Sequence, residues 1–487
     1  METMHFGFRF DNSYARLPKS LFTIVNPAQV REPAIVIFND NLAKGLGLDT
    51  SALKTNLGAA ILVGNVIPKE SSPLAQAYAG HQFGHFTILG DGRAILLGEQ
   101  LTPSGKRYDL QFKGSGRTPY SRGGDGKATL GPMLREYLIS EAMHGLNIPT
   151  TRSLSVCTTG EMVLREEKLP GAVLTRVAKS HLRVGTFQYA ATLQTTDELK
   201  LLADYAIERH YPNALQEEHK YLGLLREVIR SQAVLVAKWM LVGFIHGVMN
   251  TDNVTISGET IDYGPCAFMD IFDPATVFSS IDRQGRYAYA NQPMIANWNL
   301  ARFADSLLPL LDPVEEIAVK LAEDELKQFS NVYDQHYLDG MRRKLGLIGA
   351  NPEDTSLIRD LLHLMYEHQA DYTNTFLALT FARYNQSKLT QSENFESWLQ
   401  RWKERLSKNP SGPDAVQKIM KTNNPAVIPR NHRVEEALRQ AVQNGDLKPL
   451  RKLLDVLKDP FAHSGQQREY AKPPDPSATP YRTFCGT

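Results

Sequence analysis

The residues with the clearest chemical potential lie between 246 and 264, in the sequence HGVMNTDNVTISGETIDYG. Asp252 and Asn253 stand together in a polar loop, and the stretch that follows predicts a β-hairpin turning near Ser257, with Asp262 at its end. Because a hairpin brings its two ends together, we expect Asn253 and Asp262 side by side. An amide oxygen and a carboxylate suit Mg²⁺, which needs only one or two protein ligands when it binds together with a triphosphate.

The same segment resembles the protein-kinase pattern H-R-D-x-x-x-x-N followed by D-F-G. His246 takes the first position, Asn253 the eighth, and residues 262–264, Asp-Tyr-Gly, match the second motif. Val248 stands where a kinase carries its catalytic aspartate, and an apolar side chain cannot accept a proton. Asp252 is the nearby carboxylate that could act as a base. A polar loop with a capping aspartate would give the same letters, so the motif alone leaves both interpretations open.

Residues upstream favour the kinase-like interpretation. The sequence RYDLQFKG predicts a strand that ends at Lys113, and residues 132–146 predict a helix that begins with Pro132 and contains Glu136. Kinases pair a strand lysine with a helix glutamate, which holds the lysine on the nucleotide phosphates. Either residue alone would be typical of a solvated surface charge. In this order ahead of the loop, the pair indicates a nucleotide cleft.

Glycine-rich stretches offer further contacts to phosphate. Residues 86–100, FTILGDGRAILLGEQ, predict a hairpin with its turn at Asp91. Gly90 and Gly92 would let the backbone approach phosphate oxygens there, and Arg93 would add charge. The stretch could equally be only a tight hairpin.

A second glycine-rich stretch spans residues 121–131, and its Asp125 and Gly126 precede the start of a helix, where anions bind favourably. Arg176 and Arg183 flank the junction between the two halves of the chain. Arginine suits bidentate contacts to phosphate, although each of these two residues taken alone would more often be a surface residue.

The order of the elements predicts the architecture. Strand patterns dominate the first part of the chain, and helical periodicity dominates from about residue 197, including 220–249, most of 313–383, 391–407 and 432–457. This predicts an α+β protein with a bilobal, protein-kinase-like fold. The expected parts are an extension over 1–70 packed on the core, a β-rich N-lobe over 71–180, a helical C-lobe over 181–458 and a Pro-rich, irregular tail over 459–487.

Length and charge exclude several classes of protein. The chain has 487 residues, more than one core normally accommodates. Its 54 basic and 53 acidic residues argue against a general nucleic-acid binder. The start does not read as a signal peptide, and the most apolar stretch, 233–249, is short for a membrane span. Three cysteines are too few for a disulfide scaffold. We therefore expect a soluble protein that binds neither nucleic acid nor membrane.

Longer blocks of the sequence resemble the selenoprotein O family of pseudokinases. The resemblance rests on SPLAQAYAGHQFGHF, DLQFKGSGRTPYSRGGDGKATLGPMLREYL, HGVMNTDN and IDYGPCAF, and it runs over nearly the whole chain. It implies a cytoplasmic bacterial protein adenylyltransferase, in which ATP lies flipped in the kinase cleft. AMP would then pass to Ser, Thr or Tyr hydroxyls of proteins with the help of Mg²⁺ or Mn²⁺. Some bacterial members are described as using UTP, so uridylylation stays open.

Carried onto this sequence, the resemblance also implies residue roles. Lys113 would contact the phosphates, Glu136 would orient Lys113, Asn253 and Asp262 would hold the metal, and Asp252 would be the base. Further nucleotide contacts are implied for Gly90, Gly92, Arg93, Asp125 and Gly126, and contacts to the distal phosphates for Arg176 and Arg183.

The cysteines raise a separate hypothesis. Many animal members of this family carry selenocysteine near the C-terminus, where this chain has Cys485. A disulfide between Cys485 and Cys266 would tether the tail beside the metal site. The alternative is a buried Cys266 and a free Cys485.

Two other activities stay open at this stage. One is a kinase that moves the γ-phosphate, which Val248 disfavours. The other is a non-catalytic nucleotide-binding scaffold, which has little need of both Asn253 and Asp262.

Overall fold

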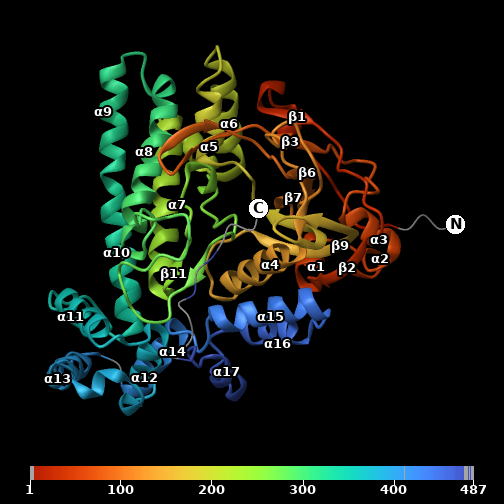
Figure 1. Ribbon diagram of the computed structural model, residues 1–487. Coiled ribbons are helices and arrows are strands. Elements are labelled where there is room, and N and C mark those ends of the chain that lie inside the picture. Colours follow the sequence, from red (N-terminus) through yellow and green to blue (C-terminus); the bar gives the residue numbers. More distant parts are fainter. Residues whose placement is uncertain (1–4, 411, 476–480, 482, 484–487) are drawn as a thin grey trace.

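The computed structural model describes residues 5–410, 412–475, 481 and 483. Strands dominate the first part of the described chain and helices the second (Figure 1). The predicted α+β class with a kinase-like, two-lobed arrangement is confirmed. The domain boundaries given above stay predictions.

One large antiparallel sheet organises the N-lobe. Its strand order is β1-β3-β6-β7-β10-β9-β2, with β8 paired beside β10. The two edge strands, β1 and β2, come from the first 70 residues, so the N-terminal segment completes the sheet. The strands are β1 (Phe22–Ile24), β2 (Ala34–Phe38), β3 (Leu74–Gln76), β4 (Ala79–Gln82), β5 (His85–Ile88), β6 (Ala94–Leu101), β7 (Arg107–Lys113), β8 (Ala128–Thr129), β9 (Arg152–Leu164), β10 (Lys168–Ala178), β11 (Phe244–Ile245) and β12 (Ala267–Phe268).

The central strands are buried on both faces because each face meets a different apolar core. Side chains alternate along a strand, so neighbours point to opposite sides of the sheet. On β9, Val156 belongs to the core under the long helix that follows Thr129, whereas Cys157 belongs to the core formed with the N-terminal helices. This double covering fixes the registers of β7 and β10, which carry Lys113 and Arg176.

The predicted hairpin over residues 86–100, with its turn at Asp91, is wrong. β5 pairs with β4 in a separate two-stranded sheet, and its tight turn is Phe83-Gly84, with φ of 50° and 92°. Two-residue hairpin turns need such positive φ values. β6 exists as expected but pairs with β3 and β7. Asp91 is buried, and its carboxylate accepts a hydrogen bond from the backbone N–H of Gln76 at 3.1 Å.

Most of the other regular structure is α-helical. They are α1 (Asp40–Leu46), α2 (Thr50–Leu53), α3 (Asn56–Leu62), α4 (Leu130–Gly145), α5 (Val184–Ala190), α6 (Asp197–His210), α7 (Lys220–Val242), α8 (Gln292–Leu311), α9 (Glu315–Leu326), α10 (Gln328–Lys344), α11 (Asp354–Glu367), α12 (Tyr372–Thr380), α13 (Glu393–Ser407), α14 (Pro413–Asn423), α15 (Asn431–Asn444), α16 (Lys448–Leu457) and α17 (Gly465–Tyr470).

Several predicted helix boundaries move. α4 begins at Leu130, so Pro132 lies within its first turn, where a missing N–H is tolerated. α7 ends at Val242 and does not reach residue 249, because Gly243 takes a left-handed φ of 71° and closes the helix. α17 lies in the tail that we expected to be irregular. None of the helices in the described ranges is long and apolar enough to cross a bilayer.

The last helix pair reaches back to the N-lobe. α15 and α16 pack directly on α4, and Figure 1 shows them in blue beneath that helix. Arg135 of α4 fixes this contact: its guanidinium pairs with Glu435 of α15 at 2.8 Å and donates to the carbonyl of Cys266 at 2.6 Å. The C-terminal helices therefore hold the helix that carries Glu136.

Candidate active site

The polar loop after α7 is fixed between two short strands. β11 ends the turn after α7 and pairs with β12, which follows Asp262. His246 lies directly after β11, is buried, and its Nε2 lies 2.9 Å from the carbonyl oxygen of Ile261. This contact ties the start of the loop to the residue before Asp262. His246 therefore has a structural position, and the loop it anchors turns Asp252 and Asn253 toward the cleft.

The hairpin predicted between residues 253 and 262 is wrong in form, although its ends do converge. The segment is an irregular turn closed by Thr255: the Glu259 N–H donates to its Oγ1 at 2.9 Å, and that hydroxyl donates to the Glu259 carbonyl at 2.6 Å. Isolated bridges hold Thr255 and Thr260 against other segments. Buried polar anchors, rather than a strand ladder, bring Asn253 and Asp262 to one cavity.

Asp252 is almost buried where the lobes meet. A side chain placed on Gly80 of β4 would approach its Oδ1 to 2.3 Å, so only glycine lets the β4–β5 hairpin close on this carboxylate. Oδ1 has no hydrogen-bond partner among the described residues. Burial raises the pKa of Asp252 to about 6, against the opposing effect of Arg183. The carboxylate is still mainly ionised at neutral pH and can accept a proton.

Asn253 and Asp262 form the donor set that a metal would need. Asn253 donates its amide N–H to the Val248 carbonyl at 3.0 Å, which leaves its amide oxygen available as a ligand. Asp262 adopts a left-handed φ of 63°, and its side chain is 31% exposed toward the cleft. Within the described ranges, no group of three or more His, Cys, Asp or Glu side chains is arranged so that it could hold a metal ion. One carboxylate and one amide oxygen nevertheless fit Mg²⁺ bound with a triphosphate.

Lys113 stands at the end of β7 between two carboxylates. Its ammonium lies 2.6 Å from Glu136 of α4 and also pairs with Asp262. Burial would raise the pKa of Asp262, but Lys113, Arg176 and Arg93 together hold it below its ordinary value. The structure therefore brings together the strand lysine, the helix glutamate and the loop aspartate that the sequence singled out.

Two buried arginines lie behind residues that line the cleft. Arg176 of β10 pairs with Glu136 at 3.2 Å and donates to Gln111 at 2.6 Å. Arg183 donates to the backbone carbonyl of Asp252 at 3.1 Å and lies 4.4 Å from the centre of the Tyr78 ring. Both guanidinium groups are nearly inaccessible to bulk solvent. Neither arginine has the surface position that the sequence left open.

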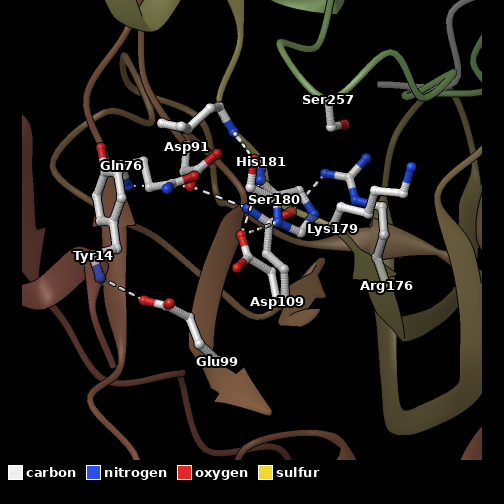
Figure 2. Close-up of polar contacts among 12 residues, drawn as sticks. Tyr14, Gln76, Asp91, Glu99, Asp109, Arg176, Lys179, Ser180, His181 and Ser257 are labelled. Carbon is white, nitrogen blue, oxygen red and sulfur yellow. Dashed lines mark hydrogen bonds and ion pairs between the residues drawn. The ribbon is translucent and has the colours of Figure 1, made fainter. Parts of the chain in front are cut away.

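The segment joining the lobes, residues 179–183, is held by buried carboxylates that the sequence analysis missed. The Lys179 N–H donates to Glu259 at 2.9 Å, and the His181 N–H donates to Asp109 at 2.9 Å. Figure 2 shows Asp109, His181 and Arg176 on the neighbouring elements. Burial raises the pKa of Glu259 to about 7 and lowers that of His181 to about 4. Single polar residues within strand-like stretches gave no sequence signal for these contacts.

The glycine-rich stretches line a second, smaller cavity of 570 Å³. A side chain on Gly90 would collide with the Tyr120 ring at 2.4 Å, so glycine is required there for close packing. Asp125 pairs with Arg165 at 2.9 Å at the rim. This cavity is bordered by Gly90, Gly92, Arg93, Asp125, Gly126, Asp252 and Asp262.

Only half of the predicted cysteine pair can be placed. Cys266 is buried without a disulfide partner in the described residues, and burial raises the pKa of its thiol to about 12. Cys485 lies outside the described residues, so the disulfide stays a prediction. Nearby, the Thr483 hydroxyl donates to the Pro265 carbonyl at 2.9 Å, which places the described end of the tail beside this segment.

This geometry defines a class: a two-lobed, kinase-like cleft with metal donors, a paired lysine and buried arginines, in which Val248 replaces the usual catalytic carboxylate. Comparisons with known proteins agree. The family model described as "Protein adenylyltransferase SelO" matches residues 5–458. The chain belongs to this family.

Relatives match the chain from end to end. The protein nucleotidyltransferase YdiU of Brevibacillus brevis is 62% identical over 485 residues, covering 100% of this chain and 99% of the relative. The protein of the same name from Bacillus cytotoxicus is 61% identical over 481 residues, covering 99% and 98%. That from Anoxybacillus flavithermus is 60% identical over 484 residues, covering 99% and 100%. The chain is accordingly an enzyme, a protein nucleotidyltransferase, that uses a nucleotide and acts on proteins.

Proposed function

We propose that this enzyme transfers AMP from ATP to Ser, Thr or Tyr hydroxyls of proteins, with the nucleotide reversed relative to its orientation in a kinase. The observation that carries the proposal is a pair of buried arginines directly behind the cleft, Arg176 beside Glu136 and Arg183 beside Asp252. Arg176 and Arg183 are buried there, and arginine suits phosphate oxygens through bidentate hydrogen bonds. A triphosphate pointing inward leaves the α-phosphate beside Asp252 and the adenine toward the opening.

The segment between the lobes supports the same orientation. A purine needs an apolar slot with free backbone donors. Here the N–H groups of Lys179 and His181 are already bonded to Glu259 and Asp109, and charged side chains border the segment. A base that bonded to these N–H groups would displace the carboxylates of Glu259 and Asp109. Their buried charges would then lack partners, which is energetically costly.

The proposed chemistry uses the residues already placed. The acceptor hydroxyl oxygen forms a bond to the α-phosphorus, the bond to the bridging oxygen breaks, and pyrophosphate leaves. Asp252 takes the hydroxyl proton. Lys113 holds phosphate oxygens, and Glu136 keeps Lys113 in place. Asn253 and Asp262 would hold Mg²⁺ or Mn²⁺, which when bound neutralises phosphate charge.

Parallel incubations with α-labelled and γ-labelled ATP test this proposal. Label from the α-phosphate is expected on acceptor protein, with the mass of AMP added to Ser, Thr or Tyr, and γ-label is not. Incorporation of γ-label alone would establish a kinase instead. Incorporation of neither label would leave a nucleotide-binding scaffold. The same assay with α-labelled UTP, and with Mn²⁺ in place of Mg²⁺, decides which nucleotide and metal the enzyme prefers.

A further inference from the structure

Two cavities meet at the reaction centre. The smaller one, 570 Å³, carries the glycine-rich stretches, and the larger one, 1290 Å³, carries Lys113, Glu136 and Asn253. Both are bordered by Asp252 and Asp262. Small-molecule sites usually measure about 300–1,000 Å³, so the smaller cavity suits part of a nucleotide, whereas the larger one exceeds that range. The larger cavity has room for a second reactant.

The larger cavity also has apolar side chains among polar ones on elements outside the polar loop. Met162 and Pro170 of the β9–β10 hairpin form one side, and Leu438 and Val442 of α15 form another. Ile281 stands on the segment that follows Asp262. Met162 is 58% exposed and Ile281 54% exposed, and both line this cavity. Exposed apolar surface at a cleft mouth is typical of a binding site.

We propose that this apolar part of the larger cavity, the outer cleft, is the docking site for a segment of the acceptor protein that carries an apolar side chain next to the hydroxyl to be modified. The inference rests on the proposed function, because a protein hydroxyl must reach Asp252 for the transfer to occur. Asp252 lines the same cavity as these apolar residues, whereas Gly90, Gly92 and Gly126 line the smaller cavity. An acceptor segment lying there meets the reaction centre without displacing the nucleotide.

The charges around the outer cleft favour an apolar contact rather than a charged one. Lys168 and Arg439 alternate there with Glu167 and Glu436, so neither sign dominates. A mixed polar rim around an apolar centre is the usual anatomy of a protein-binding surface. The apolar residues therefore carry the recognition in this proposal.

The chain supplies a matched control for each exposed residue. Leu164 is 67% exposed on the same strand and the same face as Met162, but it does not line the cavity. Ile271 is 47% exposed and also follows Asp262, and it too lies away from the cavity, unlike Ile281. Because all four side chains are exposed, a glutamate at any of them is tolerated by the fold.

The experiment compares Met162→Glu and Ile281→Glu with Leu164→Glu and Ile271→Glu in the full-length enzyme. The acceptors are dephosphorylated β-casein, an unfolded probe, and the inactive Asp262→Ala protein, a folded probe. Transfer of α-label gives kcat/KM for each acceptor, and calorimetry with α,β-methylene ATP and Mg²⁺ gives the nucleotide Kd. The two cleft variants should lose about tenfold or more in kcat/KM for an acceptor, with unchanged Kd, whereas the two controls stay near wild type.

Three results would overturn the inference. Equal kcat/KM for all four variants and wild type would show that the outer cleft does not bind the acceptor. A weaker nucleotide Kd in the cleft variants, with unchanged acceptor KM, would assign the outer cleft to the nucleobase. Wild-type enzyme that transfers no α-label to either acceptor would overturn the proposed function itself, and this inference with it.

Discussion

Two buried lysines lie in regions that surround them with different chemical groups. Lys113, in the cleft between the lobes, pairs with Glu136 and Asp262. Lys344, at the end of α10 in the C-terminal helical layer, lies 4.1 Å from the ring centre of Phe376 and 5.5 Å from that of Tyr372. No carboxylate within the described ranges pairs with it. Burial accordingly lowers the pKa of Lys344 to about 7.

The contrast is between a buried lysine that is paired with carboxylates and a buried lysine that has aromatic rings beside it. Two carboxylates hold the Lys113 ammonium in one position, which would preorganise it to meet phosphate. A buried cation over aromatic rings gains some cation–π stabilisation but loses its hydration. We therefore expect substitution of Lys113 to affect transfer and substitution of Lys344 to affect stability.

The largest expected effect comes from removing the cleft lysine. Lys113→Met should reduce adenylyl transfer by at least about 100-fold, the usual effect of losing one preorganised donor in a site. Lys344→Met is the matched control and should keep activity within about twofold, because it touches nothing in the cleft. Steady-state transfer of α-label measures both. Comparable losses of activity in the two variants would show that Lys113 matters no more for transfer than Lys344 does.

The second prediction sharpens the role of the carboxylate beside Lys113. Asp262→Ala should abolish metal-dependent transfer, because the anionic donor to the metal is lost. Asn253→Ala should lower it less, because it removes a neutral donor. Titrating Mg²⁺ at fixed ATP measures both effects as a shift in the metal concentration needed. Near-wild-type activity in Asp262→Ala would contradict the assignment of the metal site.

The third prediction concerns the pH dependence of stability caused by Lys344. Its pKa is about 7 in the folded protein, against an ordinary 10.5, so the unfolded chain binds more protons between these values. Stability therefore rises with pH across this window, by about 1 kcal/mol per pH unit, and is lowest below pH 7. Lys344→Met should remove this slope and raise Tm at pH 7. Parallel Tm profiles for the two proteins would show that Lys344 is solvated.

The smallest effect is expected at Glu259, which holds the inter-lobe segment. Its pKa is raised from 4.5 to about 7, so its contribution is fully present below pH 4.5 and declines as pH rises to about 7. Glu259→Gln keeps an acceptor for the Lys179 N–H without the charge. The variant should match wild type at pH 4 and be more stable by about 1–3 kcal/mol at pH 8. Denaturant midpoints at the two pH values test this, and a less stable variant at pH 8 would contradict it.

Much of the site could be predicted because its parts are local in sequence. Strand alternation located the end of β7 at Lys113, helical spacing located Glu136 on α4, and the loop motif placed Asp252 and Asn253 ahead of Asp262. Each of these signals lies within one element or one loop. The family followed from the same blocks of sequence, since their length makes a chance match negligible.

Strand pairings between distant segments could not be predicted from such local patterns. The sequence suggested that β5 pairs with β6, but the Phe83-Gly84 turn pairs it with β4 and sends that hairpin onto Asp252. Asp91 looked like a turn residue and is instead a buried acceptor. Which strands meet depends on burial across the whole sheet, and a local pattern contains no information about it.

The sequence by itself determined which residues border the candidate site and the order of the elements that carry them, because these follow from side-chain type and short-range periodicity. Only the tertiary structure decided what surrounds them. The carboxylates of Asp109 and Glu259 accept hydrogen bonds from the inter-lobe segment, and Arg176 and Arg183 are buried. Lys344 is buried with no carboxylate of the described residues paired to it. The residue type determines whether a side chain can carry a charge. Its cost or its use depends on the groups that folding places within a few ångströms of it, and these come from distant parts of the chain.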